Sequence, residues 1–158
     1  MAKILIVYYS KGGNTRRMSE YVAQGAKEEG GVEVLAKPVE EVRVEELLQA
    51  QGLIIGSPTY YGTMAWPVKR LLDESVRYHR QLEGRVGAAF TSSGNRAGGN
   101  ETTVLDILKA LLIHGMIIYG SSEGDHYGPA AVGAPDLEAQ ESCLRLGRRV
   151  AGLVKRLF

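Results

Sequence analysis

The first candidate for chemistry is a short glycine-rich loop that directly precedes a predicted helix. It follows the apolar run at residues 4–9 and consists of Ser10, Lys11, Gly12, Gly13, Asn14 and Thr15. Adjacent glycines allow the backbone to turn tightly and to aim its N–H groups inward, and a helix N-terminus adds about half a positive charge. The loop therefore predicts a phosphate site, although an ordinary strand-to-helix turn capped by Ser or Asn fits the same residues.

Two further loops carry side chains suited to holding a flat heterocycle. One follows the apolar run at residues 53–57 and reads Pro58, Thr59, Tyr60, Tyr61, Gly62, Thr63 and Met64. The other follows the run at residues 85–91 and reads Ser92, Ser93, Gly94, Asn95, Arg96, Ala97, Gly98, Gly99 and Asn100. Tyrosine rings can lie against a planar ligand, and glycine-rich backbone lets that ligand approach closely. Taken separately, one tyrosine could instead cap the core, and the glycine-rich stretch could be a flexible surface loop.

The three loops are separated by a regular alternation of short apolar runs and amphipathic segments. The runs have the length and composition of buried strands and lie at residues 4–9, 32–37, 53–57, 85–91 and 116–119. The amphipathic segments have helical spacing and lie at residues 14–29, 43–50, 67–76, 101–113 and 136–157. Residues 120–135 are expected to form a loop. This alternation predicts a single α/β domain over residues 1–158, with a doubly wound, five-stranded parallel sheet between two layers of helices.

The predicted sheet brings the three loops together. The carboxyl ends of parallel strands meet at one edge of a sheet, and ligands of doubly wound folds bind at that edge. All three loops follow strands, so we expect them to converge and to form one pocket. The first loop suits a single phosphate, and the other two suit a flat ring. Flavin mononucleotide (FMN) combines these features, and the sequence therefore predicts an FMN site.

Composition and charge narrow the possible classes of protein further. Glycine supplies 20 of the 158 residues, against roughly 11 at average usage, and six of these glycines lie in the three loops. The formal net charge is +1, which argues against nucleic acid as a partner. Cys143 is the only cysteine and fits a reducing compartment, and every apolar run is far shorter than the roughly 20 residues of a membrane span. These features predict a soluble cytoplasmic protein without a signal peptide.

Several short motifs carry a resemblance to a known family. They are Tyr9-Ser10 ahead of Gly13, Gly56-Ser57-Pro58-Thr59 with Gly62 and Met64, Leu72-Asp73, Ser92-Ser93-Gly94 through Gly99 with Glu101-Thr102, and His114-Gly115-Met116. With these motifs the chain resembles the flavodoxin-like flavoproteins along nearly its whole length. It most resembles the NAD(P)H:quinone oxidoreductases of the tryptophan-repressor-binding-protein type. The resemblance implies a flavodoxin-like sheet with the strand order 2-1-3-4-5.

The resemblance also implies a role for each candidate residue. The flavin phosphate would be held by Ser10, Lys11, Gly12, Gly13, Asn14 and Thr15. The isoalloxazine ring would lie beside Pro58, Thr59, Tyr60, Tyr61 and Gly62. Its polar edge would face Ser92, Ser93, Gly94, Asn95 and Gly98. His114 matches a family histidine at the flavin site, where it could neutralise the reduced ring or protonate a quinol as a catalytic residue; it could equally be a cation at a helix C-terminus.

The activity implied by the resemblance is hydride transfer from NAD(P)H to a quinone or a similar two-electron acceptor, with FMN as the cofactor. Relatives of this kind are often oligomers, which implies a homodimer or a homotetramer. The alternative is a flavodoxin-type protein that carries single electrons. Such carriers are typically very acidic and have an aromatic residue in the third loop, whereas this chain has a net charge of +1 and no aromatic residue between Ser92 and Asn100. These two differences favour the enzyme.

Overall fold

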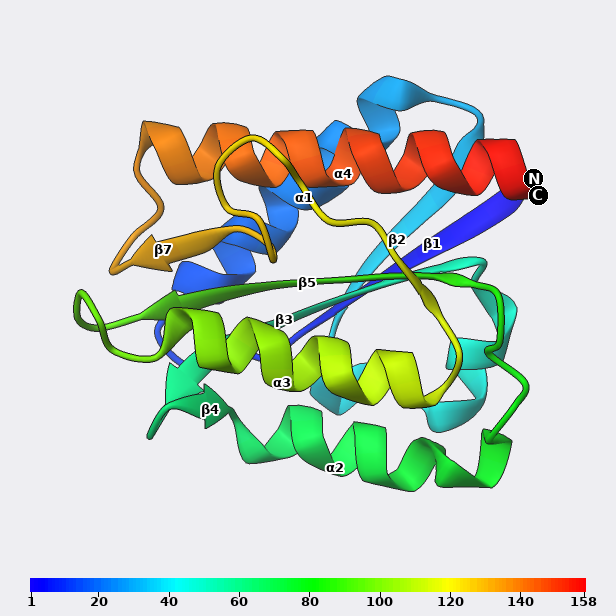
Figure 1. Ribbon diagram of the computed structural model, residues 1–158, viewed down its shortest axis with the longest axis horizontal. Coiled ribbons are helices and arrows are strands. Elements are labelled where there is room, and N and C mark those ends of the chain that lie inside the picture. The colour runs from blue at the N-terminus through cyan, green and yellow to red at the C-terminus, as the bar shows by residue number, and fades with distance from the viewer.

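A sheet of mainly parallel strands forms the middle layer of the molecule (Figure 1). The computed structural model describes residues 1–158. The strands follow the order β2-β1-β3-β5-β6 across the sheet, with the bounds β1 (Ala2–Tyr8), β2 (Val32–Pro38), β3 (Gly52–Tyr60), β5 (Val86–Ser93) and β6 (Ile117–Ile118). Because β4 is a short hairpin strand outside this row, the order is the predicted one, and the doubly wound, flavodoxin-like fold is confirmed.

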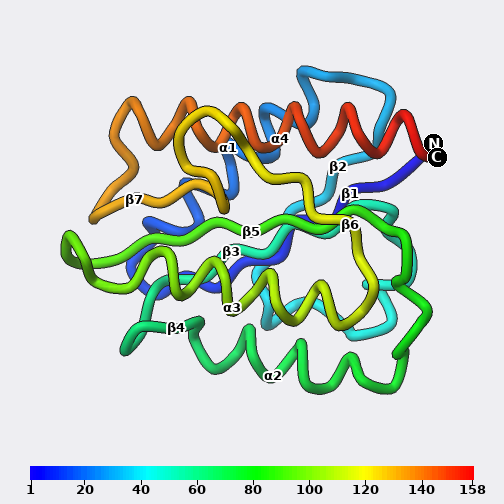
Figure 2. Tube along the Cα trace, viewed as in Figure 1, coloured from blue at the N-terminus to red at the C-terminus, as the bar shows by residue number.

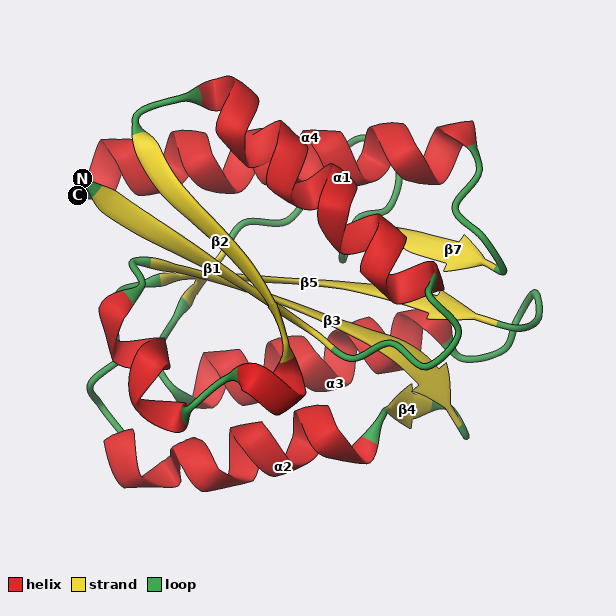
Figure 3. Cartoon of the chain, turned by 180° about the vertical axis from the view of Figure 1, so that it is seen from behind, coloured by secondary structure: helices red, strands yellow, loops and turns green.

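Two helices cover each face of the sheet, so the molecule has three layers (Figures 1 and 3). The helices α1 (Asn14–Glu29) and α4 (Leu137–Leu157) lie side by side on one face. The helices α2 (Trp66–Glu74) and α3 (Asn100–Ile113) cover the other face. Short 3-10 helices at Val39–Glu41, Val44–Gln49 and Ser75–Tyr78 complete the connections, and the second of them is the helix expected at residues 43–50.

Alternate side chains of each strand point to opposite faces and build two separate cores. On β1, Ile4 and Ile6 join the core beneath α1 and α4, whereas Leu5 and Val7 join the core beneath α2 and α3. These four side chains are at most 2% exposed. Burial on both faces explains why the strand is a continuous apolar run in the sequence, and it leaves the strand ends as the place where polar groups can meet a ligand.

The fifth place in the sheet is shared by two short strands, of which the sequence predicted only β6, at residues 116–119. β6 pairs with the first two residues of β5, and β7 (Ala130–Val132) pairs with its last three. Residues 119–129 leave the sheet between these strands (Figure 2). The prediction of a loop at residues 120–135 is therefore wrong at β7, because three residues are too few to show a strand period.

The backbones of α1 and α4 approach each other closely at two glycines. A methyl group at Gly25 would overlap the carbonyl oxygen of Leu144, and one at Gly147 would overlap the carbonyl oxygen of Val22. Such a close approach needs residues without a Cβ atom. It holds α1 in place, and the first turn of α1 borders the carboxyl edge of the sheet.

We expect the substitution Gly147→Ala to lower the free energy of unfolding by about 1–3 kcal/mol, the usual cost of overpacking. Gly152→Ala on the same helix is the matched control, because its added methyl group would meet no atom closer than 3.7 Å. That control should stabilise the helix by about 0.5–1 kcal/mol. Urea unfolding of the two variants would measure both changes, and equal stability of the two would contradict the close approach of the helices.

Candidate functional site

A pocket of about 190 Å³ opens at the carboxyl edge of the sheet. Residues from all three predicted loops line it, together with one residue that the sequence did not predict: Ser10, Lys11, Gly12, Asn14, Thr15, Pro58, Thr59, Tyr60, Ser92, Ser93, Gly94 and Gly133. The structure therefore brings the three loops together, as the sequence predicts. The remaining predicted residues lie beside the pocket or, in one case, far from it.

The first turn of α1 has no side-chain cap. Its N-cap residue is Gly13, with a φ of 97° that favours glycine, and no side chain accepts a hydrogen bond from the first turn. Gly13 itself donates its backbone N–H to Ser10 Oγ over 3.1 Å. The helix N-terminus therefore keeps free N–H groups and the positive end of its dipole at the pocket, which is an arrangement that favours an anion.

Hydroxyl groups join the first and third loops across the floor of the pocket. Thr15 is 1% exposed, and its Oγ1 lies 2.8 Å from Ser92 Oγ. Farther along the edge, Thr59 Oγ1 lies 3.0 Å from Thr91 Oγ1 and donates to Asn100 Oδ1 over 3.3 Å. These bonds tie the ends of β3 and β5 to the starts of α1 and α3. They also make the floor polar without making it charged.

The two predicted tyrosines have different surroundings. β3 continues to Tyr60, and β4 (Thr63–Met64) pairs back on it, so Tyr61 and Gly62 form the two-residue turn of a hairpin. Their φ angles of 49° and 80° are both positive, as in a type I′ turn. Tyr61 is fully exposed at the tip, whereas Tyr60 lines the pocket and packs edge-on against Tyr9, with ring centroids 6.3 Å apart. Burial raises the pKa of Tyr60, so its hydroxyl stays protonated at neutral pH.

Other predicted residues shape the loops from outside the pocket. Ser93 Oγ donates to the carbonyl oxygen of Asn95 over 3.0 Å, and Gly98 donates its N–H to the same oxygen over 3.1 Å. A methyl group at Gly99 would lie 2.8 Å from the Cα atom of Gly62, so the second and third loops touch. Asn95, Gly98 and Gly62 thus hold the loop geometry without lining the pocket.

His114, which the resemblance places at the flavin site, does not line this pocket. His114 follows the last residue of α3, and Asn100, beside Thr59, is the first. A helix of this length spans about 21 Å, so His114 lies near the opposite edge of the sheet. The sequence motif marks a helix end but does not tell which edge of the sheet that end meets.

Hydrogen bonding defines which nitrogen of the His114 ring carries the proton. Its Nε2 lies 2.7 Å from Ser75 Oγ, and that hydroxyl already donates to the Leu72 carbonyl oxygen over 2.6 Å. Nε2 therefore carries the proton and donates to Ser75, which leaves Nδ1 as a buried acceptor with no partner. Burial and the neighbouring His79 lower the pKa of His114. The lowered pKa and the unpartnered Nδ1 favour a neutral ring over the cation that a helix C-terminus would attract.

Gly133 is the pocket residue that sequence reasoning missed. It follows β7, and its N–H donates to the Ser93 carbonyl oxygen over 2.7 Å. Its φ of 70° is left-handed. The only local signal was a glycine close to Pro135, which is ordinary for a loop.

The chain has neither a cluster of metal ligands nor a reactive thiol. No group of three or more His, Cys, Asp or Glu side chains is placed to hold a metal ion. Cys143 is fully buried, and burial raises the pKa of its thiol to about 12, so it is no nucleophile at neutral pH. None of the helices combines the length and hydrophobicity that crossing a membrane requires.

The lowered pKa of His114 predicts a loss of stability in mild acid. The unfolded chain binds this proton more readily than the folded chain, so stability is complete above about pH 6.5, the usual histidine pKa, and decreases below it. His114→Gln keeps a donor for Ser75 but does not titrate, and it should lose this part of the pH dependence. His126→Gln is the control, because His126 is exposed. Urea unfolding between pH 5 and 8 would measure the effect, and the same pH slope in His114→Gln and the parent would contradict it.

Comparisons with known proteins agree with this geometry. The family model described as NADPH-dependent FMN reductase matches residues 36–124. A flavodoxin of Aquifex aeolicus is 40% identical over 96% of this chain and 86% of its own length. An NAD(P)H dehydrogenase (quinone) of Archaeoglobus fulgidus is 36% identical over 99% of this chain and 100% of its own length. The crystal structure of a flavodoxin, WrbA-like protein from Agrobacterium tumefaciens matches with a TM-score of 0.83 and 27% identity, over 100% of both chains. The chain therefore belongs to the NADPH-dependent FMN reductase family and has the flavodoxin-like fold.

Proposed function

We propose that the pocket binds FMN and that the protein transfers hydride from NAD(P)H to a quinone or a similar two-electron acceptor. The observation that carries the proposal is the uncapped N-terminus of α1, which lies in one pocket with the ends of β3 and β5. The family description and the quinone dehydrogenase among the relatives support the same activity.

The first loop fits the phosphate of FMN. Methyl groups built on Gly12 and Gly13 would meet no atom within 4 Å, so there is space for a ligand against the backbone. Ser10 Oγ accepts from Gly13 and keeps its own proton to donate. Together with Asn14 and Thr15, this cradle would bind one phosphate through N–H and O–H donors and the helix dipole.

The second and third loops fit the flavin ring. Tyr60 would lie along one side of the ring, with its protonated hydroxyl at the pocket edge. Ser92, Ser93 and Gly94 would face the polar edge of the ring, where main-chain donors favour negative charge. FMN, when bound, would supply the hydride chemistry, and these residues would orient it and limit its contact with water.

A one-electron carrier is the second candidate, because relatives at 40% and 34% identity are named flavodoxins. Two features of this chain favour the enzyme instead. The third loop offers no aromatic residue to cover the ring, and the net charge of +1 does not steer the protein toward basic partners.

The proposal extends to a cytoplasmic location and to a homodimer or homotetramer. Exposed apolar side chains on α3 support self-association, since Leu112 is 55% exposed and Ile113 is 73% exposed.

We expect FMN to bind the apoprotein about 100-fold more tightly than riboflavin, because two charge-assisted hydrogen bonds to phosphate contribute about 3 kcal/mol. Quenching of flavin fluorescence would measure both affinities. Equal affinities would show that the cradle at α1 does not hold the phosphate.

A pair of variants controls this experiment. Thr15→Val removes the hydroxyl at the pocket, and we expect it to weaken FMN binding about tenfold. Ser19→Ala removes a buried hydroxyl from the same helix, where it donates to the Arg16 carbonyl oxygen, and it should leave FMN affinity unchanged. Thermal unfolding would verify that both variants fold.

Catalytic turnover tests the activity itself. The FMN-loaded protein should oxidise NADPH or NADH in the presence of benzoquinone and far more slowly without it, as followed at 340 nm under anaerobic conditions. A protein that binds FMN but oxidises no reduced nicotinamide with any quinone would be a carrier, and the proposed enzyme activity would be wrong.

A further inference from the structure

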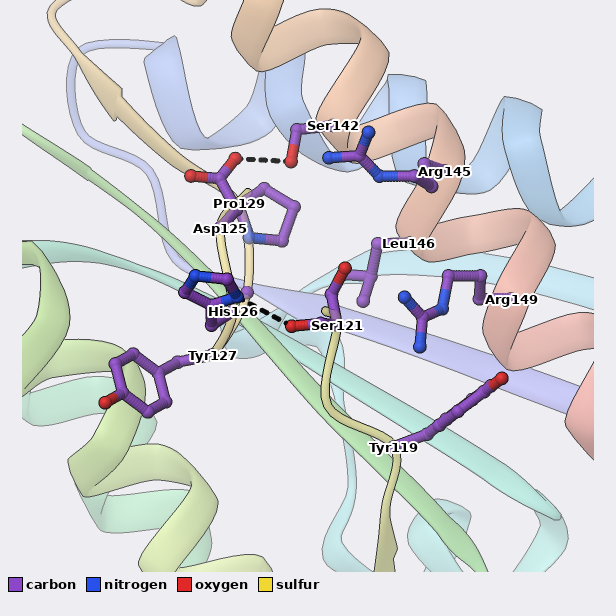
Figure 4. A pocket seen from close by; sticks show the side chains of 11 residues that line it. Tyr119, Ser121, Asp125, His126, Tyr127, Pro129, Ser142, Arg145, Leu146 and Arg149 are labelled. Carbon is purple, nitrogen blue, oxygen red and sulfur yellow. Dashed lines mark hydrogen bonds between the residues drawn. The ribbon is translucent and has the colours of Figure 1, made fainter. Parts of the chain in front are cut away.

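A second polar pocket lies beside the segment that interrupts the fifth strand. Residues 119–129 pass along α4, and with it they enclose a cavity of about 20 Å³ (Figure 4). The cavity shares no lining residue with the pocket at the carboxyl edge of the sheet. Nothing in the proposed FMN chemistry uses it.

Two arginines on one side of α4 line this cavity. Arg145 and Arg149 lie one helical turn apart, and Figure 4 shows both side chains leaving α4 toward the loop. Neither has a carboxylate partner within ion-pair distance, whereas Arg148 between them pairs with Glu28 at 3.0 Å and Glu141 at 2.5 Å. Two half-buried arginines without carboxylate partners, at one cavity, favour an anion.

Contacts with the loop hold Arg149 in place. Its guanidinium lies 4.2 Å from the centroid of the Tyr119 ring, and its Nη2 donates to the Gly120 carbonyl oxygen over 2.5 Å. Stacking occupies the flat face of the guanidinium and leaves its other N–H groups free to donate. His126 steadies the same loop, because its Nδ1 donates to the Ser121 carbonyl oxygen over 2.8 Å.

One carboxylate also faces the cavity. Asp125 accepts a hydrogen bond from Ser142 on α4, and its backbone has a left-handed φ of 36°. Its charge offsets only one of the two arginines. The cavity therefore keeps an excess of positive charge and of unused donors.

We propose that this pocket binds a phosphate group through Arg145 and Arg149. The cavity holds one or two water-sized groups, so it suits the oxygens of a phosphate and excludes a nucleobase. Planar guanidinium groups match phosphate geometry well. Two sources share this chemistry: inorganic phosphate and the 2′-phosphate that NADPH carries and NADH lacks. The second source rests on the proposed use of NAD(P)H.

The test uses FMN-saturated protein, so that phosphate does not compete for the cradle at α1. We expect inorganic phosphate and 2′-AMP to shift the backbone amide NMR signals of Gly120, Gly124 and Gly128, with saturation below about 10 mM. Arg145→Gln should weaken this binding at least tenfold. Arg148→Gln is the matched control and should leave it unchanged, since Arg148 faces Glu28 and Glu141.

The outcomes distinguish inorganic phosphate from the 2′-phosphate of NADPH. They also separate the phosphate site on α4 from the proposed enzyme activity. Tighter binding of 2′-AMP than of phosphate, with NADPH but not NADH as a competitor, would identify the nucleotide. Equal binding of 2′-AMP and phosphate would identify the free ion. No shift at the three glycines, or binding unchanged by Arg145→Gln and Arg149→Gln, would overturn the site. These signals are read without turnover, so a failure of the proposed enzyme activity would leave this result intact.

Discussion

The candidate site depends on three parallel strands whose carboxyl ends lie at one edge of the sheet. Gly56 is the central residue of this arrangement, because it pairs with Tyr8 of β1 on one side and with Phe90 of β5 on the other. A methyl group at Gly56 would overlap the Phe90 ring, so the ring packs directly on the glycine backbone. The loops can form one pocket only because the strands beneath them share a register.

The two proposed anion sites differ in the chemistry of their donors. At the carboxyl edge, the donors are backbone N–H groups and hydroxyls, as the Thr15–Ser92 bond and the uncapped α1 illustrate. Such a cradle would bind a phosphate without placing a strong charge beside the flavin ring. On α4, arginines supply charge directly, and a loop supplies the walls. Near the end of that loop, Gly128 packs on the Ala89 carbonyl oxygen, where any side chain would overlap that atom.

Most of the fold and most of the pocket could be predicted from sequence because their signals are local. A strand buried on both faces is a continuous apolar run, as at residues 4–9, and a tight loop that needs left-handed backbone contains glycine, as at Gly13. Parallel pairing follows from the alternation of strands and helices. The predicted residues that line the pocket all lie within a few residues of such a strand end.

The sequence by itself therefore determined the alternation of strands and helices, the three loops and the hydroxyl-rich character of the site, and the family resemblance added the order of the strands. Only the tertiary structure decided that His114 donates to Ser75 far from the pocket, that Tyr60 rather than Tyr61 lines it, and that Gly133 closes it. The reason is physical. Backbone conformation and burial period depend on near neighbours in the chain, whereas the direction of a side chain depends on packing partners that are distant in the sequence.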